Sequence, residues 1–356
     1  MSNTIAISID AMGGDHGPAV AVPGVALASE RLGAQAHRFL LHGDAERIEA
    51  ELARLPQLRD RCEVRHTDKA IGSEEKAAHA LRRGKGSSLW NCVEAVRNGE
   101  ARAAVSGGNT GALMAISKLQ LRMILGLDRP AIVATWPTLR GRSAVLDVGA
   151  NVTSDAAQLV EFAIMGEAFH RAVHGVQKPT IGLLNVGSEE QKGHEEVREA
   201  HRLLGEIGLD LDYRGFVEGD DIAKGTVDVV VTDGFSGNIA LKTAEGTARF
   251  VRQVLREAFT SSLQAKLSAL IAGPALKKMG ARLDTSLVNG GPLLGLTGIV
   301  VKSHGGADAR GFANAIKVAV DLANSDYDKQ IEWRLKQLAA ALPEVETLQA
   351  AAETAH

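Results

Sequence analysis

Residues 227–238 read VDVVVTDGFSGN, and this stretch decides the fold class. It begins with Val227–Val231, in which every residue except Asp228 is the β-branched Val, and such a run is typical of a strand that is buried on both faces. A turn rich in Asp, Gly and Asn follows, and the next residues, Ile239–Phe259, have the apolar period of a helix. The stretch therefore predicts a strand, a tight turn and a helix in immediate succession.

The same unit occurs five more times along the chain. Strands that alternate with helices and form continuous apolar runs indicate a mainly parallel sheet with helices on both faces. We therefore predict an α/β fold, a three-layer α/β/α sandwich, in which the Gly-rich turns leave the carboxyl ends of the strands and gather at one ligand-binding edge. The other predicted strands are Ile5–Asp10, Ala103–Val105, Ser143–Leu146, Thr180–Leu184 and Ile299–Val301, followed by helices near Val20–Arg31, from Ala112, from about Ser154, over Glu195–Leu204 and from about Arg310.

The chain shows no internal boundary between domains. No low-complexity tract or linker rich in Pro, Gly and Ser divides its 356 residues. We therefore predict one large domain over residues 1–341. The last residues, 342–356, are rich in Ala and Glu, and we expect them to form a frayed tail.

The composition excludes several classes of protein. With 45% hydrophobic residues the chain can bury a large core, and a net charge of −3 without a basic stripe argues against nucleic-acid binding. Cys62 and Cys92 form no CxxC motif, which predicts neither a disulfide framework nor a zinc ribbon and fits a reducing cytoplasm. The N-terminus lacks the pattern of a signal peptide, and no apolar run reaches roughly 20 residues, so we expect any membrane contact to be peripheral.

The Gly-rich turns suggest an anionic ligand. Turns that open helices direct backbone N–H groups and the positive helix end toward one point, which suits a phosphate or an oxyanion. The dinucleotide and P-loop motifs are absent, so we expect no nucleotide cofactor. Ser236 resembles the nucleophile of a GxSxG elbow, but Asn238 replaces the last Gly and no Asp/His order accompanies it, which favours a turn residue. His170 and His174 lack the HExxH glutamate, so we expect no metal site.

Four of the turns, in this order along the chain, resemble those of the bacterial phosphate acyltransferases that make acyl phosphates. They are Ile9–Asp15, Ser106–Gly111, Leu146–Asn151 and Asp233–Asn238, and the resemblance extends from about Ile5 to Leu322. It implies a fold like that of isocitrate and isopropylmalate dehydrogenases and phosphotransacetylase. It also implies a homodimer that needs no metal or nucleotide and works in the cytoplasm, in peripheral contact with the inner face of the cell membrane.

The resemblance also implies the site residues. In that family the lysine of an Asn-x-Gly-x-Glu-x-x-Lys-Gly loop and the last asparagine of Asp-Gly-Phe-x-Gly-Asn act in catalysis, and Lys192 and Asn238 occupy these positions. The carboxylates of the turns are expected to orient a lysine or a turn rather than to touch an anion. The expected substrate-binding residues are Asp10, Gly13, Gly14, Asp15, His16, Gly107, Asn109, Thr110, Asp147, Asn151, Asn185, Gly187, Asp233, Gly234, Phe235 and Gly237.

The activity that this resemblance implies is the transfer of a long-chain fatty acyl group from acyl carrier protein to inorganic phosphate. The acyl phosphate then passes to a membrane-bound glycerol-3-phosphate acyltransferase in the first step of phospholipid synthesis. Direct attack of phosphate on a thioester needs a bound dianion and oxyanion donors but no enzyme nucleophile. Two alternatives remain open, namely a phosphotransacetylase that uses short acyl-coenzyme A and a non-catalytic scaffold at the membrane.

Residues 260–282 have the pattern of an amphipathic, membrane-contacting helical segment. Leu263, Leu267, Leu270 and Ile271 share one helical face, and Leu276 continues the apolar character beside cationic residues. The alternative is that this face packs in the core or in a dimer interface, because amphipathic helices usually bury their apolar face in protein.

Overall fold

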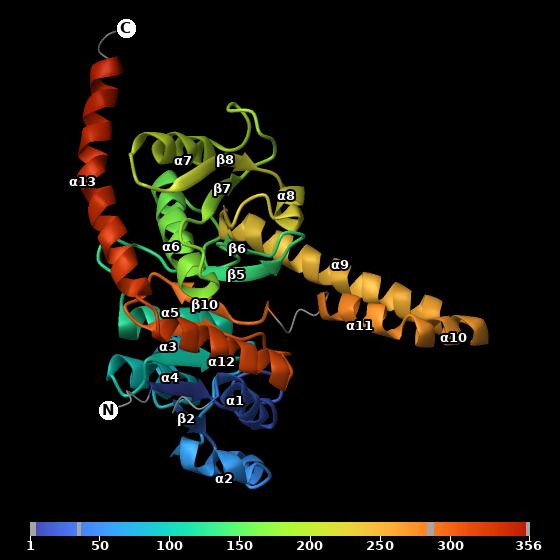
Figure 1. Ribbon diagram of the computed structural model, residues 1–356. Helices are drawn as coiled ribbons and strands as arrows, with labels where there is room; N and C mark the ends of the chain where they lie inside the picture. The colour runs from blue at the N-terminus through green and yellow to red at the C-terminus, as the bar shows by residue number, and fades with distance from the viewer. Residues whose placement is uncertain (1–4, 34–36, 283–287, 354–356) are drawn as a thin grey trace.

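The computed structural model describes residues 5–33, 37–282 and 288–353. These residues form one eleven-stranded sheet with helices on both of its faces (Figure 1). In sheet order the strands are β3 (Cys62–His66), β2 (His37–Gly43), β1 (Ile5–Asp10), β4 (Ala103–Ser106), β11 (Ile299–Lys302), β10 (Gly291–Leu294), β5 (Ala131–Pro137), β6 (Arg142–Leu146), β9 (Val229–Val231), β7 (Thr180–Leu184) and β8 (Asp212–Val217).

The sheet consists of two parallel wings joined by an antiparallel centre. The first wing contains the parallel strands β3, β2, β1, β4 and β11. The second contains the parallel strands β6, β9, β7 and β8. Between them β10 pairs antiparallel with β11 and β5, and β5 pairs antiparallel with β6. Three antiparallel pairings in succession make the two wings run in opposite directions.

This reversal corrects one prediction. The turns after β1, β4 and β11 leave one edge of the sheet, whereas those after β6, β7 and β9 leave the opposite edge, so the six turns do not share a single edge. The prediction was wrong because β10 and β5, the strands that reverse the direction, are not among the predicted strands. The six predicted strands are all present, and the mainly parallel sheet is confirmed.

Helices cover both faces of the sheet, which confirms the three-layer α/β/α fold. Each face has its own apolar core, and the helices divide between these two cores. The first face carries α1 (Pro18–Leu32), α2 (Ala45–Leu52), the 3₁₀ helix η1 (Pro56–Arg61), α6 (Ala156–His174), α7 (Glu195–Glu206), α12 (Ala309–Ala323) and α13 (Tyr327–Glu353). The second carries α3 (Ala77–Arg83), α4 (Ser88–Arg97), α5 (Thr110–Leu121), α8 (Gly219–Lys224) and the start of α9 (Gly234–Thr260).

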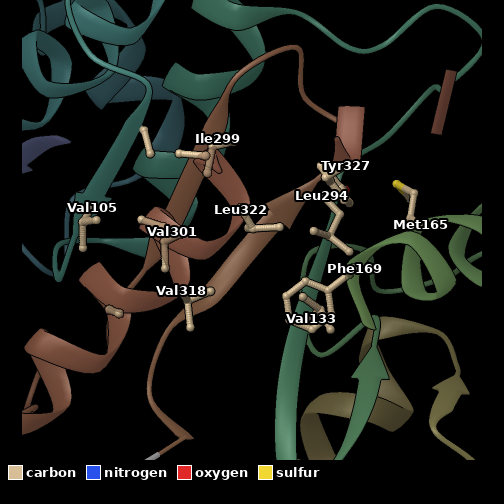
Figure 2. Close-up of a cluster of buried hydrophobic side chains, with 14 of the residues drawn as sticks. Val105, Val133, Met165, Phe169, Leu294, Ile299, Val301, Val318, Leu322 and Tyr327 are labelled. Carbon is tan, nitrogen blue, oxygen red and sulfur yellow. The ribbon is translucent and has the colours of Figure 1, made fainter. Parts of the chain in front are cut away.

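The core of the first face is continuous across the junction of the two wings. Figure 2 shows Phe169 of α6 next to Val133 of β5 and Leu294 of β10, and Val318 and Leu322 of α12 belong to the same cluster. All five side chains are buried. Because each fully buried aliphatic or aromatic side chain contributes about 1.5–3 kcal/mol, this cluster holds the two wings together.

Side-chain caps fix the starts of the helices. At α6 the Asp155 carboxylate accepts from the Gln158 N–H at 2.8 Å, and the Gln158 side chain accepts from the Asp155 N–H at 3.2 Å, as the predicted start near Ser154 requires. At α9 the Asp233 side chain accepts from the Ser236 N–H at 2.8 Å. That cap makes the Gly-rich turn the first turn of α9, so the helix begins at Gly234, earlier than predicted.

The long helix α9 extends away from the sheet, and α10 (Leu263–Ile271) and α11 (Gly273–Arg282) fold back along it (Figure 1). In the described part of the chain, no helix is both long and apolar enough to span a membrane. The tail from 342, which we expect to be frayed, continues α13 as helix to Glu353. Its Ala and Glu residues are strong helix formers, which favours this continuation. Residues 354–356 lie outside the described residues.

Candidate active site

A cavity of about 900 Å³ lies over the antiparallel centre of the sheet. One wall is the length of β5, residues 132–137, and another is the N-terminal half of α9. β5 runs from one edge of the sheet to the other. The cavity therefore connects the turns after β4 and β11 with the turn after β6 and the first turn of α9. The remaining lining comes from Thr110, Val148, Gly149, Ala223, residues 288–291, Lys302 and residues 304–308.

The turns of the first wing meet around a buried carboxyl group. Asp10, at the end of β1, is almost completely buried, and its Oδ2 accepts from the Ser106 hydroxyl at 2.6 Å. The Ser106 oxygen in turn accepts from the Gly108 N–H at 3.0 Å. Burial raises the pKa of Asp10, while hydrogen bonds from Ser106 and Ser88 and from the backbone of Met12 and Gly13 act against the rise. Gly13 closes the turn, where a Cβ would lie 2.5 Å from the Asp10 carboxyl and 2.7 Å from the Gly108 nitrogen.

Other predicted residues of the first wing hold neighbouring segments together. The Asp15 N–H donates to the Gly305 carbonyl at 3.0 Å, and a Cβ on Gly14 would lie 2.8 Å from the same oxygen. Asn109 caps α5 and also donates to the carbonyls of Ser73 and Glu75 at 2.7 and 2.8 Å. Asp15 and His16 are exposed, and the exposed Thr110 lines the cavity.

Lys302, the last residue of β11, lines the cavity and is not among the predicted site residues. Its Nζ donates to the Gly107 carbonyl at 3.2 Å and also contacts the Ser303 carbonyl. Burial lowers the pKa of Lys302 to about 8, with a smaller lowering from Lys242, while Asp10 and Asp15 act in the opposite direction. The predicted strand Ile299–Val301 ends next to this lysine, and that position was the signal available in the sequence.

The turn after β6 is organised by Asp147. This buried carboxylate accepts from the N–H groups of Ile132, Gly149 and Ala150 through Oδ1, and from the N–H and the side-chain amide of Asn151 through Oδ2. Burial raises the pKa of Asp147, and the hydrogen bonds from Ala150, Ile132 and Asn151 act against the rise. The carboxylate is thus occupied by protein donors, and Asp147 and Asn151 together shape the turn.

The first turn of α9 packs on the turn organised by Asp147. Gly234 N–H donates to the Asn151 carbonyl at 2.8 Å, and Asn238 lies beside Gly149, where a Cβ on the glycine would be 3.6 Å away. Asn238 is exposed to the cavity and lines it. The Ser236 hydroxyl donates to Asp233 at 2.9 Å, which fits the predicted role as a turn residue, and the Phe235 side chain is exposed.

Lys192 lies in a third cluster, in the loop after β7. Asn185 donates to the Lys192 carbonyl at 3.0 Å, and the Lys192 ammonium pairs with Glu189 at 3.1 Å, close to Gly187. Among the described residues that line the cavity, Asn238 is present and Lys192 is not. The structure thus brings the predicted residues together in three groups, and the cavity joins the first two.

The cavity combines two chemical environments. Lys302 and Lys242 provide cations near the turns, and Asn238 provides an amide, whereas Ile132, Ala134 and Leu241 provide apolar surface. Such a cavity suits a ligand with an anionic and an apolar part. Over the described chain, no group of three or more His, Cys, Asp or Glu side chains could hold a metal ion.

The fold is shared with phosphotransacetylases. A phosphotransacetylase from Streptococcus pyogenes superposes with a TM-score of 0.60 at 17% identity, and the likeness covers 91% of this chain and 95% of that one. The α/β class and the phosphotransacetylase-like fold are thereby confirmed.

Sequence comparison identifies the family more closely. A family model described as "Fatty acid synthesis protein" matches residues 5–330. The chain is 67% identical to the phosphate acyltransferase of Caulobacter vibrioides, with 96% of this chain and 94% of that protein covered. It is 60% identical to the phosphate acyltransferase of Phenylobacterium zucineum, with 96% and 97% covered. The chain therefore belongs to the phosphate acyltransferase family of fatty acid synthesis proteins.

Proposed function

We propose that this protein transfers a long-chain fatty acyl group from acyl carrier protein to inorganic phosphate. The observation that carries the proposal is the cavity over β5, in which cations and an amide near the Gly-rich turns adjoin an apolar wall. Phosphate would be held at the polar part, with the start of the acyl chain against Ile132, Ala134 and Leu241. The names of the relatives at 60–67% identity support the same reaction.

The reaction needs no covalent enzyme intermediate. A phosphate oxygen attacks the thioester carbonyl, a C–O bond forms, the C–S bond breaks, and the carrier thiolate leaves and takes up a proton. The protein's contribution is to hold phosphate next to the carbonyl and to stabilise the developing oxyanion. Asn238 is proposed to donate to that oxyanion or to orient the phosphate, and Lys192 to neutralise charge during the attack.

The product supports a proposed place at the inner face of the cell membrane. A long-chain acyl phosphate is an amphiphile, and a membrane-bound glycerol-3-phosphate acyltransferase would consume it. The proposed contact is the exposed apolar side of α10, formed by Leu263, Leu267, Leu270 and Ile271, of which Ile271 is 85% exposed. Leu276 differs from these residues, because it is half-buried and lines a cavity between α9, α10 and α11.

A homodimer is the proposed assembly. Phe250, Val251 and Val254 on α9 are large apolar side chains that lie exposed on the single chain, and Phe250 is 68% exposed. Together they form an apolar surface of the kind that subunit interfaces cover. Cytoplasmic location belongs to the same proposal.

The central experiment is to incubate the purified protein with palmitoyl acyl carrier protein and phosphate, and to follow release of the carrier thiol. We expect thiol release that requires phosphate and produces acyl phosphate. Equal release without phosphate would identify a thioesterase, and the absence of turnover would leave the scaffold alternative. Acetyl-coenzyme A as a competing donor separates the reaction from that of a phosphotransacetylase, because efficient use of the short donor would contradict the long-chain proposal.

A further inference from the structure

Lys302 occupies an unusual place for a lysine, at the end of a central strand. Lys302 is half-buried, and its side chain lines the cavity over β5. The ammonium contacts the carbonyls of Gly107 and Ser303, so two of its three N–H donors have backbone partners. One donor therefore remains for a group inside the cavity.

The charges around Lys302 leave it uncompensated at close range. Within the described residues, no carboxylate pairs with its ammonium within 4.0 Å. Asp10 and Asp15 act on it only from a greater distance, and Asp10 uses its Oδ2 to accept from Ser106. Lys242, which also lines the cavity, is paired with Glu245 at 3.3 Å and has a side chain that is 55% exposed. Lys302 is thus better placed than Lys242 to attract an anion out of water.

We propose that Lys302 binds the phosphate substrate directly, as the cation of the phosphate subsite. The inference rests on the proposed function only in taking phosphate as a substrate. A partly desolvated ammonium interacts strongly with a dianion, because the local dielectric is lower than that of water. The contact with Gly107 fixes the ammonium relative to the turn after β4, so the cation is positioned before phosphate arrives.

This proposal assigns separate tasks to two lysines. Lys302 holds phosphate in the ground state at the wall of the cavity. Lys192 pairs with Glu189 and does not line the cavity. Its proposed task is to neutralise charge during the attack. Loss of Lys302 should therefore weaken phosphate binding in the absence of any acyl donor, which is a property that turnover alone does not report.

The test measures inorganic phosphate binding by calorimetry, without acyl donor, for the wild type, Lys302→Met and Lys302→Arg. We expect Lys302→Met to weaken phosphate binding about 10–100-fold and Lys302→Arg to retain most of it. In turnover assays the KM for phosphate should rise for Lys302→Met, while the KM for acyl carrier protein stays unchanged. The matched control is Lys118→Met, because Lys118 also donates to a backbone carbonyl, that of Asp128 at 2.9 Å, but lies outside the cavity lining.

A second measurement on the wild type covers the case in which Lys302→Met does not fold. Phosphate affinity should decrease as the pH rises through about 8, where Lys302 loses its proton in the field of Asp10, Asp15 and Lys242. Lys302→Arg, whose guanidinium stays charged, should lack this decrease and serves as the reference for the ionisation of phosphate itself. Wild-type phosphate affinity in folded Lys302→Met, or identical pH profiles for the wild type and Lys302→Arg, would overturn the proposal.

The outcomes for the two proposals are distinguishable. Phosphate-dependent turnover together with an unchanged phosphate affinity in Lys302→Met contradicts the role of Lys302 and leaves the proposed function intact. Phosphate binding that depends on Lys302, without any acyl transfer, supports the subsite and contradicts the proposed function.

Discussion

Gly237 packs directly against the carbonyl oxygen of Asp147, so that a Cβ at this position would overlap that oxygen. The contact joins the first turn of α9 to the turn after β6, and it sets the position of the next residue, Asn238. We expect Gly237→Ala to destabilise the fold by about 3 kcal/mol or more, because backbone rather than a flexible side chain must move. Urea unfolding measures this loss.

The matched control for this substitution lies in the same helix. A Cβ on Gly246 meets no atom within 4 Å, so Gly246→Ala should be neutral or should stabilise the protein by up to about 1 kcal/mol. Equal stability of the two variants would show that the packing of Gly237 on Asp147 is not a constraint on the fold.

The second prediction concerns the proposed catalytic pair. Lys192→Ala and Asn238→Ala should each lower kcat/KM for acyl transfer about 10²–10³-fold, or roughly 2–4 kcal/mol, if they act on the phosphate and the oxyanion. Lys178→Ala is the control, since Lys178 is also a surface lysine in an ion pair, with Asp210 at 2.5 Å. Near-normal turnover in both folded variants would refute the assignment and leave Lys192 as the partner of Glu189.

The sequence predicted local features of the fold better than distant ones. Val229–Val231 and the start of α6, which Asp155 caps, were predictable because a strand, a turn and a cap depend on a few consecutive residues. The strand Gly291–Leu294 was not, because it is short and begins with Gly and Pro. Without it, the opposite directions of the two wings could not be inferred.

In the candidate site, too, local features were predicted better than contacts between distant parts of the chain. The turn residues were predictable from their composition, but Lys302 depends on a contact with Gly107, which is 195 positions away in the chain. Sequence spacing likewise placed Lys192 and Asn238 in turns that follow neighbouring strands, β7 and β9. It could not say that one of them lines the cavity while the other pairs with Glu189.

The third prediction is a pH dependence of stability that originates at Glu161 in α6. Burial, and then the carboxylates of Asp128 and Asp155, raise the pKa of Glu161 from 4.5 to about 7. Because the folded state favours the protonated form, this stabilising contribution is complete below about pH 4.5 and is lost as the pH rises through 7. Glu161→Gln should therefore be more stable than the wild type at pH 8, by about 1 kcal/mol after allowance for solvent screening of this half-buried group.

Urea unfolding at pH 5 and pH 8 measures this effect. The difference between the variant and the wild type should be larger at pH 8 than at pH 5. Glu196→Gln, at an exposed position of α7, is the control and should change neither value. A difference that does not vary with pH would mean that Glu161 ionises alike in the folded and unfolded states.

The last prediction tests the proposed membrane contact of α10. Leu267 and Ile271 are 56% and 85% exposed, so replacing each by Asp removes apolar surface without opening a cavity in the core. If this side of α10 enters the lipid interface, Leu267→Asp and Ile271→Asp should reduce cosedimentation with phosphatidylglycerol vesicles while turnover with soluble acyl carrier protein stays normal.

Leu125→Asp is the matched control, because Leu125 is 93% exposed but precedes β5, away from α10. It should leave vesicle binding unchanged. Undiminished vesicle binding by the α10 variants would exclude the lipid contact, and loss of the dimer on size-exclusion chromatography would instead assign these side chains to the subunit interface.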